Sequence, residues 1–381
     1  MDRLRAWFRT TDAQLVGLTL FVKVFLFAWG LIVVALVSNR PVDLGGVFSI
    51  WNRWDAPHYL DVAIFGYTAY DPGNLAMYSK LGDLDLFIVF YPLFPWATRA
   101  GLAFLPELVA PIAVSAVASV AAVLLLYRLV AREFGERIGK RAAIFMLIFP
   151  TAYFLHIGYT ESLFLALVLG SFLSARTDRW WLAGLLGGLA ALTRVNGLIL
   201  IPALALEAWL QWTDERKWRW AWMAIGLVAV GFGGYLLVNY AVYGNPFEFL
   251  RIQQEHWYKS LAWPWEGISG VLNSFNYDNP EDVVMYGATE LAAIGLGLVG
   301  TLVAVRRFRP GWFAWMAGNW LLFVSTSFVL SVPRYTLTMF PLFAWFAQLA
   351  ERRWVGIALG VVSTGLFLWF SARFATGAWA F

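Results

Sequence analysis

The sequence contains no cysteine, only three histidines and few charged residues for its length of 381. Without cysteine the chain can form no disulfide bond, no cysteine-ligated zinc site and no iron–sulfur cluster. Charged residues make up 14% of the chain, whereas they make up about 25% of an ordinary soluble domain. Lysine and arginine form neither a long run nor a stripe, so the net charge of +4 does not indicate a nucleic-acid partner.

Apolar residues dominate the remainder of the composition. They account for 60% of the chain, with 22 tryptophans, 31 phenylalanines and a mean hydropathy of +0.65. This composition predicts an all-α polytopic membrane protein, with a single transmembrane domain over residues 1–381 that is surrounded by membrane lipids. The first apolar run, 15–37, is too long for the core of a signal peptide, so we expect a retained membrane anchor.

Apolar runs of about 20 residues match the ~30 Å hydrocarbon layer of a membrane. Segment 86–105 is apolar but interrupted by Pro92 and Pro95, which favours a segment that re-enters the membrane or lies along its surface. Segment 181–210 fits one long helix with a buried arginine or a hairpin of half-spans, and charges on both flanks favour the hairpin. We predict eleven spans, at 15–37, 109–128, 142–158, 160–176, 181–193, 197–210, 219–242, 286–305, 312–331, 335–350 and 354–370.

Basic residues gather at the N-terminus and in segment 128–141, and the positive-inside rule places both on the cytoplasmic side. Eleven crossings then place the C-terminus on the opposite side. The polar stretches all fall on the outer side in this topology. They are the first outer loop, 38–85, the second long outer loop, 243–285, and the shorter stretches 149–153, 159–162, 193–197 and 331–335. This segregation predicts a functional site on the extracytoplasmic face.

The first outer loop holds an acid, two indoles, a guanidinium and an imidazole within eight residues. Asp55 is the candidate general base, which needs a carboxylate within hydrogen-bond reach of an acceptor hydroxyl. The alternative is a loop carboxylate that pairs with Arg53 or caps the next turn. Trp54 fits a sugar-stacking platform or a membrane-interface residue. His58 could bind a metal together with Asp55, although the chain offers few further ligands. Asp61 could share a helical face with Asp55 or be solvated.

Arg194 and Arg334 are the candidate anion-binding residues. An arginine at membrane depth is unfavourable unless paired, and its guanidinium recognises phosphate with two parallel hydrogen bonds. The alternative is that each pairs with Glu161 or another carboxylate. Glu161 itself fits either the N-terminal cap region of the span 160–176 or a site residue. The acid pair in 83–85 resembles a metal-binding motif of soluble sugar transferases, but without a phosphate-binding loop we interpret it as a solvated loop edge.

Four of these stretches, in order and spacing, resemble the PIG-V mannosyltransferase family, which belongs to the GT-C superfamily of multi-span glycosyltransferases. The similarity covers roughly residues 50–200, and beyond it only Pro333-Arg334-Tyr335 is similar. The four stretches are Arg53-Trp54-Asp55 with His58, Phe90-Tyr91-Pro92-Leu93-Phe94-Pro95, Tyr159-Thr160-Glu161-Ser162, and Leu192-Thr193-Arg194-Val195-Asn196-Gly197.

The resemblance implies a GT-C bundle that transfers a hexose, most simply mannose, from a polyprenyl-phosphate donor to a glycan or glycolipid acceptor on the extracytoplasmic face. It implies an inverting, metal-independent reaction without a cofactor, in which Asp55 is the base and Arg194, with Arg334, holds the donor phosphate. The compact chain indicates a prokaryotic plasma membrane protein; its oligomeric state stays open. Residues expected to support the site are Arg53, Trp54, His58, Asp61, Tyr91, Tyr159, Glu161 and Asn196.

Two alternatives stay open from the sequence. One is a GT-C enzyme with another sugar donor, such as glucose or a pentose, because the identity of the sugar depends on pocket shape. The other is a non-enzymatic lipid flippase or carrier, which also needs an outward groove and arginines for a lipid phosphate. Such a carrier has no need for a unique carboxylate at the edge of the groove.

Overall fold

The computed structural model describes residues 10–38, 46–67 and 84–381, so the basic N-terminal residues and Asp83 lie outside it and the first outer loop is described in part. Within these ranges the chain is helical, apart from one isolated antiparallel bridge between Leu261 and Thr326. Helices are expected because the membrane interior offers no water to unpaired backbone groups. The prediction of an all-helical polytopic membrane protein is confirmed.

Among the described residues, six helical stretches are long and apolar enough to cross a membrane. They are Thr11–Val37, Val109–Phe134, Val195–Glu215, Trp220–Tyr243, Pro280–Arg307 and Arg353–Thr376. Two shorter apolar helices occupy the predicted spans 160–176 and 181–193; they are α9 (Glu161–Ala175) and α10 (Trp180–Ala191). The apolar runs of the sequence thus locate most of the bundle.

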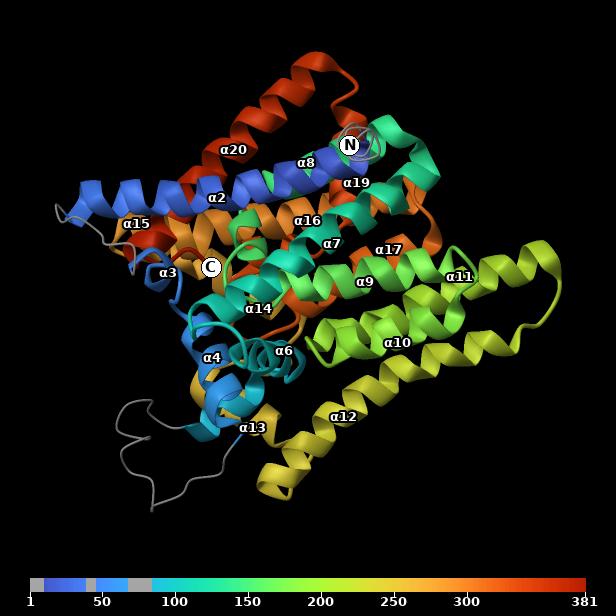
Figure 1. Ribbon diagram of the computed structural model, residues 1–381, viewed down its shortest axis with the longest axis horizontal. Helices are drawn as coiled ribbons and strands as arrows, with labels where there is room; N and C mark the ends of the chain where they lie inside the picture. Colours follow the sequence, from blue (N-terminus) through green and yellow to red (C-terminus); the bar gives the residue numbers. More distant parts are fainter. Residues whose placement is uncertain (1–9, 39–45, 68–83) are drawn as a thin grey trace.

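The long helices are α2 (Thr11–Ser38), α7 (Val109–Phe134), α11 (Leu200–Glu215), α12 (Gly226–Tyr243), α16 (Thr289–Arg307), α17 (Pro310–Val324) and α20 (Arg353–Thr376). Shorter helices are α3 (Gly46–Ser49), α4 (Asp55–Phe65), α6 (Leu93–Leu102), α8 (Glu136–Leu147), α13 (Glu248–Trp257), α14 (Pro264–Asn273), α15 (Pro280–Asp282), α18 (Val332–Thr336) and α19 (Pro341–Leu349). Single turns of 3-10 or π-helix are η2 (Leu84–Val89), η3 (Ala152–Leu155), η4 (Val195–Ile199), η5 (Trp220–Ile225), η6 (Ser274–Asn276) and η7 (Val283–Ala288). Figure 1 shows α2, α7, α9 and α16 running roughly along one another.

Three predicted spans are not continuous helices, which corrects the sequence-based boundaries. In 142–158, α8 ends at Leu147, and turns follow until α9. In 335–350, α18 and α19 are separated by four non-helical residues, and α17 ends well before the end of 312–331. Pro150 and Pro341 explain two of the breaks, because proline cannot donate a hydrogen bond and disfavours helical geometry in the residue before it. Hydropathy alone cannot show such interruptions.

Segment 181–210 is a hairpin. Trp180 at the start of α10 donates its indole N–H to Gln211 near the end of α11, at 3.1 Å. The two helices therefore run in opposite directions, and Arg194 lies at the tip between them. The tip is tight, since a Cβ on Gly197 would lie 2.5 Å from the backbone nitrogen of Ala191. The hairpin interpretation is confirmed, and α10 also packs on α12 through small residues that permit close backbone approach.

Segment 86–105 does not form a membrane-length helix. Its main element, α6, has ten residues and is therefore about 15 Å long, half the ~30 Å hydrocarbon thickness. In Figure 1, α6 is seen nearly end-on while α7 and α9 run across the view. The backbone N–H of Leu93 donates to Leu192 at 3.1 Å and so ties this segment to the hairpin. These observations fit a re-entrant or surface segment.

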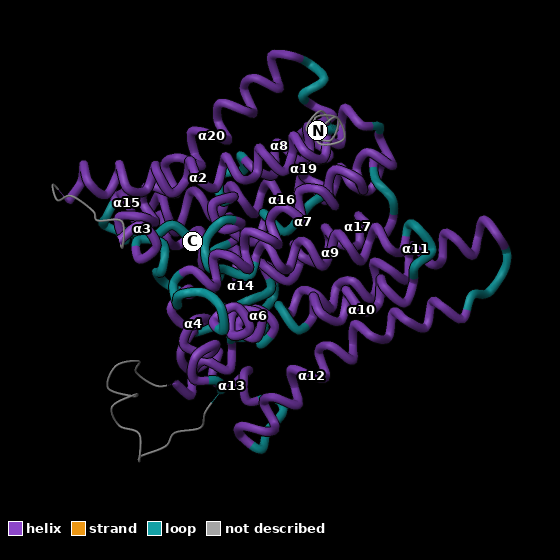
Figure 2. The backbone as a smooth tube through the Cα atoms, viewed as in Figure 1, coloured by secondary structure: helices purple, strands orange, loops and turns teal. Residues whose placement is uncertain are grey.

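The basic loops and the polar stretches lie at opposite ends of the bundle. Helix α9 joins the two ends, with Glu161 as its first residue and Arg176 directly after its last. At the basic end, Arg128 pairs with Asp12 at 2.6 Å. At the other end the long helices stop, and the non-helical segments gather around α4, α6 and α14 (Figure 2). The separation expected from the sequence is therefore present in the fold.

Candidate functional site

Asp55 is the first residue of α4, and a strained turn presents it. The preceding Trp54 has φ 56° and ψ −112°, a backbone conformation that non-glycine residues rarely adopt. The hydroxyl of Tyr159 holds both sides of this turn. It donates to the carbonyl of Arg53 at 2.9 Å and accepts from the backbone N–H of Asp55 at 3.2 Å. The buried start of α9 thus fixes the position of Asp55, and the positive end of the α4 dipole favours a negative charge there.

Replacing Tyr159 by phenylalanine should therefore loosen the turn without emptying the core. We expect a loss of about 1 kcal/mol in the free energy of unfolding, the value of one or two neutral hydrogen bonds, and a clear fall in activity that depends on Asp55. The matched control is Tyr235→Phe, which removes another buried hydroxyl that donates to a backbone carbonyl, that of Ile88 at 2.8 Å. Equal activity losses in the two variants would contradict a specific role for Tyr159.

Arg334 joins Asp55 to Glu161. Its Nη1 donates to Oδ2 of Asp55 at 2.6 Å, and its Nε donates to Oε1 of Glu161 at 2.5 Å. The guanidinium carbon lies 4.6 Å from the ring centre of Tyr159 and 4.9 Å from that of Phe154. The side chain of Arg334 is 6% exposed and that of Asp55 is 33% exposed. Asp55 is therefore the more exposed member of this pair.

Arg194 binds the same carboxylate from the hairpin tip. It donates to Oε1 of Glu161, and to the hydroxyl of Thr160 at 3.0 Å. Its guanidinium lies 5.3 Å from the ring centre of Tyr335, and the ammonium of Lys259 lies 5.6 Å from the same centre. With Arg334 and Asp55, two guanidiniums face two carboxylates in this cluster. Guanidiniums recognise phosphate with parallel hydrogen bonds, so the cluster can bind an anionic ligand that displaces a carboxylate.

The turn that carries Arg334 is held by a buried acid on α16. Glu290, which is fully buried, accepts the backbone N–H of Ser331 at 2.6 Å and that of Val332 at 2.8 Å. Thr151 donates to a carbonyl of the same turn at 2.9 Å. Neither residue was among the predicted site residues. A lone acid inside the apolar run 286–305 was the available signal for Glu290, because intramembrane carboxylates are unfavourable and usually functional.

Replacing Glu290 by glutamine should displace Arg334. The carboxamide keeps the size of the side chain but presents an N–H₂ group to one of the two backbone N–H groups. Leaving a buried donor unpaired is unfavourable by about 1–3 kcal/mol, so we expect a lower thermal unfolding midpoint together with lower activity. Glu266→Gln, an exposed acid on α14, is the control. A fall in stability with full activity per folded molecule would limit Glu290 to a structural role.

Arg53, His58 and Asp61 were also predicted to support the site, and each has a different position. Arg53 does not pair with Asp55; its Nε donates to the carbonyl of Ile50 at 3.1 Å, which excludes that alternative in this structure. The ring of His58 packs 4.7 Å from that of Phe87, and burial lowers the pKa of His58, an effect that the Asp55 charge opposes. Asp61 lies about 1.7 helical turns beyond Asp55 on α4, so the two acids do not share a face.

Tyr91 and Asn196 lie outside the charged cluster. The ring of Tyr91 stacks 3.9 Å from that of Tyr235 on α12, and its buried hydroxyl has no partner among the residues that the structure describes. The amide of Asn196 donates to the side chain of Asn319 on α17 at 2.9 Å. Both residues thus join neighbouring segments. They position the hairpin and the segment before α6 rather than contact Asp55.

The described residues contain no group of three histidine, aspartate or glutamate side chains with the arrangement of a metal site. Three histidines and no cysteine leave few nitrogen or sulfur ligands in the sequence. Asp55 and Glu161 instead have arginine partners. The cluster is therefore organised by ion pairs and hydrogen bonds.

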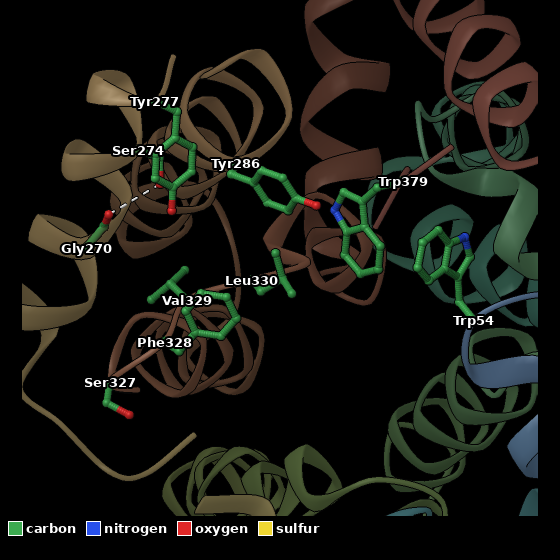
Figure 3. A pocket seen from close by; sticks show the side chains of 10 residues that line it. All are labelled: Trp54, Gly270, Ser274, Tyr277, Tyr286, Ser327, Phe328, Val329, Leu330 and Trp379. Carbon is green, nitrogen blue, oxygen red and sulfur yellow. Dashed lines mark hydrogen bonds between the residues drawn. The ribbon is translucent and has the colours of Figure 1, made fainter. Parts of the chain in front are cut away.

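A cavity of about 440 Å³ has Trp54, the residue before Asp55, in its wall. The other walls come from the second long outer loop with η7, from the segment 327–330 between α17 and α18, and from the segment after α20. Its lining residues are Trp54, Gly270, Ser274, Tyr277, Tyr286, Ser327, Phe328, Val329, Leu330 and Trp379. Figure 3 shows the aromatic rings of Tyr286, Trp379 and Trp54 in sequence along one side of this space.

Fold and site together define a helical membrane protein with an arginine–carboxylate cluster at one end of its bundle. Residues 91–237 match the family model described as dolichyl-phosphate-mannose-protein mannosyltransferase. This region is less than half of the chain. It contains Glu161 and Arg194 but neither Asp55 nor Arg334.

Two curated proteins and two solved structures are similar to the chain. The GPI alpha-1,6-mannosyltransferase 2 of Mus musculus is 32% identical over 173 residues, 42% of this chain and 31% of that protein. The protein of the same name from Cricetulus griseus is 30% identical over 183 residues, 44% of this chain and 34% of that protein. The chain thus spans about a third of the length of these relatives.

Among solved structures, ArnT from Cupriavidus metallidurans bound to undecaprenyl phosphate aligns with a TM-score of 0.49 and 16% identity. The alignment covers 95% of this chain and 76% of ArnT. The oligosaccharyltransferase of Archaeoglobus fulgidus aligns with a TM-score of 0.47 and 14% identity, over 94% of this chain and 53% of that protein.

Proposed function

We propose that the protein is a membrane glycosyltransferase of the GT-C type, which transfers a hexose, most simply mannose, from a polyprenyl-phosphate donor to an acceptor hydroxyl. The observation that carries the proposal is the juxtaposition of a carboxylate, Asp55, with the buried guanidinium of Arg334 and the partly exposed guanidinium of Arg194. The match to a family of dolichyl-phosphate-mannose-dependent enzymes supports it, as does the local similarity to GPI mannosyltransferases.

The proposed reaction uses the two halves of the cluster differently. Asp55 accepts the proton of the acceptor hydroxyl as the new bond between the acceptor oxygen and the anomeric carbon forms. The bond from that carbon to the phosphate oxygen breaks, and its electron pair leaves with the polyprenyl phosphate. Arg194 and Arg334 stabilise the charge that develops on the phosphate, and attack opposite to the leaving group inverts the anomeric configuration. No step requires a metal ion.

The shared guanidinium also couples donor binding to the base. Arg334 bonds to Asp55 at 2.6 Å, and a donor phosphate that binds Arg334 competes with Asp55 for the same N–H groups. Donor binding then frees the carboxylate for the acceptor hydroxyl. In this way the base becomes available only when a sugar is present to receive the attack.

The side of the membrane follows from charge. The basic loops lie at the end of the bundle opposite to Asp55, and the positive-inside rule assigns that basic end to the cytoplasm. Transfer then takes place on the extracytoplasmic face, and a prokaryotic plasma membrane is the proposed location. The lipid-linked donor approaches from the outer leaflet, and the acceptor is a glycan or glycolipid.

The test is an assay of the purified protein in liposomes with polyprenyl-phosphate [³H]mannose and a mixed glycolipid acceptor. Radioactivity in a product resistant to mild acid supports transfer, and its persistence with EDTA supports the metal-independent reaction. Movement of the donor between leaflets without a new product would support a lipid carrier instead. Transfer from the corresponding glucose or pentose donors, but not from the mannose donor, would show that the protein uses another sugar in the same class of reaction.

A further inference from the structure

The aromatic cavity beside Asp55 has no role in the reaction as derived above. We propose that it binds a neutral sugar ring of the acceptor, so that the acceptor of the proposed transfer is a saccharide whose terminal ring occupies this cavity. The inference rests on the proposed function, because the cavity ligand is identified as the acceptor of that reaction. The residues that it concerns are separate from those of the charged cluster. None of the hydrogen bonds and ion pairs described above joins a cavity residue to Arg194 or Arg334.

The lining of the cavity determines the charge of its ligand. None of its ten lining residues is acidic or basic, whereas the charged cluster holds the guanidiniums of Arg194 and Arg334. A phosphate or another ionised group would lose its hydration here without gaining a charged partner. The phosphate of the donor therefore belongs to the cluster, and the cavity suits a neutral group.

The chemistry of the walls further favours a sugar ring over a lipid tail. Aromatic faces suit the apolar C–H face of a pyranose, while the hydroxyls of serine and tyrosine suit its polar rim. Trp54 and Trp379 meet edge to face at 4.9 Å, and Trp379 and Tyr286 stack at 6.2 Å. Figure 3 shows Tyr277 on the other side of Tyr286 from Trp379, with its hydroxyl directed toward Val329. A volume of about 440 Å³ holds one or two sugar rings but not a long polyprenyl chain.

The backbone links the cavity to the base. The strained turn at Trp54 places its indole in the cavity wall, while Asp55, the next residue, pairs with Arg334. A ring held against Trp54 thus contacts the residue that directly precedes the carboxylate. The far wall is fixed by Arg373, which donates to the carbonyl of Trp379 at 3.1 Å and pairs with Glu281 at the start of the helix that carries Tyr286. Both walls are therefore held in place before a ligand binds.

A binding experiment separates this inference from the proposed activity. The Asp55→Asn protein, placed in lipid nanodiscs free of sugar-headgroup detergent, is examined by saturation-transfer difference NMR with methyl glycosides of mannose, glucose and N-acetylglucosamine. At least one glycoside should give a signal without any donor present. Trp379→Leu should weaken its binding by about tenfold or more, a factor that corresponds to the loss of one aromatic contact of about 1.4 kcal/mol.

A second cavity variant tests the inference independently, so that misfolding of Trp379→Leu alone does not decide the result. Gly270 lines the cavity, and a Cβ at this position meets no atom within 4 Å, so Gly270→Leu adds a side chain to the lining without a clash at its Cβ. Gly295→Leu, equally unobstructed but on α16, is its control, and Trp263→Leu is the control for Trp379→Leu. Trp263 is an exposed tryptophan that stacks on Trp265 outside the cavity.

Loss of the signal in both cavity variants, with retention in both controls, is the expected result. Absence of binding in the parent protein, or binding unchanged by both cavity variants, would overturn the inference even if sugar transfer is observed. Displacement of the glycosides by undecaprenyl phosphate would also overturn it, because the cavity would then belong to the donor. Binding as expected in a protein without transfer activity would leave the cavity assignment intact and remove the proposed reaction.

Discussion

Replacing Asp55 by asparagine is expected to reduce sugar transfer by about 10²-fold or more, the lower end of general-base effects, while leaving the fold intact. The carboxamide has the same shape and can still accept a hydrogen bond from Arg334, and the side chain at this position is 33% exposed. The measurement is the initial rate of transfer from polyprenyl-phosphate mannose at saturating donor, together with the thermal unfolding midpoint.

Asp278→Asn is the matched control for this substitution. Asp278 is an exposed acid of the second long outer loop, so its replacement removes the same charge from the same region without touching the cluster. Its rate should equal that of the parent protein. Near-normal transfer by the Asp55 variant would remove the base from the proposed mechanism, whatever the control shows.

The second large effect is expected from Arg334→Gln, in both stability and activity. The variant leaves Glu161, which has no exposed surface, with one guanidinium instead of two. Breaking a buried ion pair from one side is unfavourable by about 3–5 kcal/mol, so the unfolding midpoint should fall clearly. Loss of a group that stabilises the leaving phosphate should lower transfer by about 10²–10³-fold, by analogy with an oxyanion-binding donor.

A double variant separates the two effects. Arg334→Gln combined with Glu161→Gln removes both members of one pair and leaves Arg194 with the hydroxyl of Thr160 as a partner, so the activity should stay low. Arg251→Gln is the control, since Arg251 is 55% exposed and its pairs with Glu248 and Glu255 are worth about 1 kcal/mol or less. Recovery of transfer in the double variant would show that Arg334 acts only by neutralising Glu161.

Much of the bundle follows from the sequence, because long apolar runs have few alternatives to a transmembrane helix. The hairpin tip at Arg194 and the gathering of the polar stretches at one end were predicted from charge and topology. The breaks after Leu147 and around α18 were missed, since uninterrupted hydropathy hides a change of backbone geometry. Contacts such as Glu290 with Ser331 join residues about forty positions apart, and no local pattern specifies such distant partners.

The site, like the bundle, was predicted in part from the sequence. The sequence identified Asp55, Arg194 and Arg334 and left open whether the arginines pair with Glu161, a pairing that the structure contains. The hydroxyl of Tyr159, predicted only as a supporting residue, fixes the turn before Asp55. The aromatic cavity was not predicted, because its walls come from four separated segments whose packing a single sequence does not reveal.

The most direct test of the central claim is a structure of the Asp55→Asn protein with a polyprenyl-phosphate sugar bound. The phosphate should lie within hydrogen-bond distance of Arg334 and Arg194, with the anomeric carbon facing residue 55 and no metal between them. A lipid phosphate held instead among the basic residues at the opposite end of the bundle, such as Arg137 and Lys140, would contradict the account.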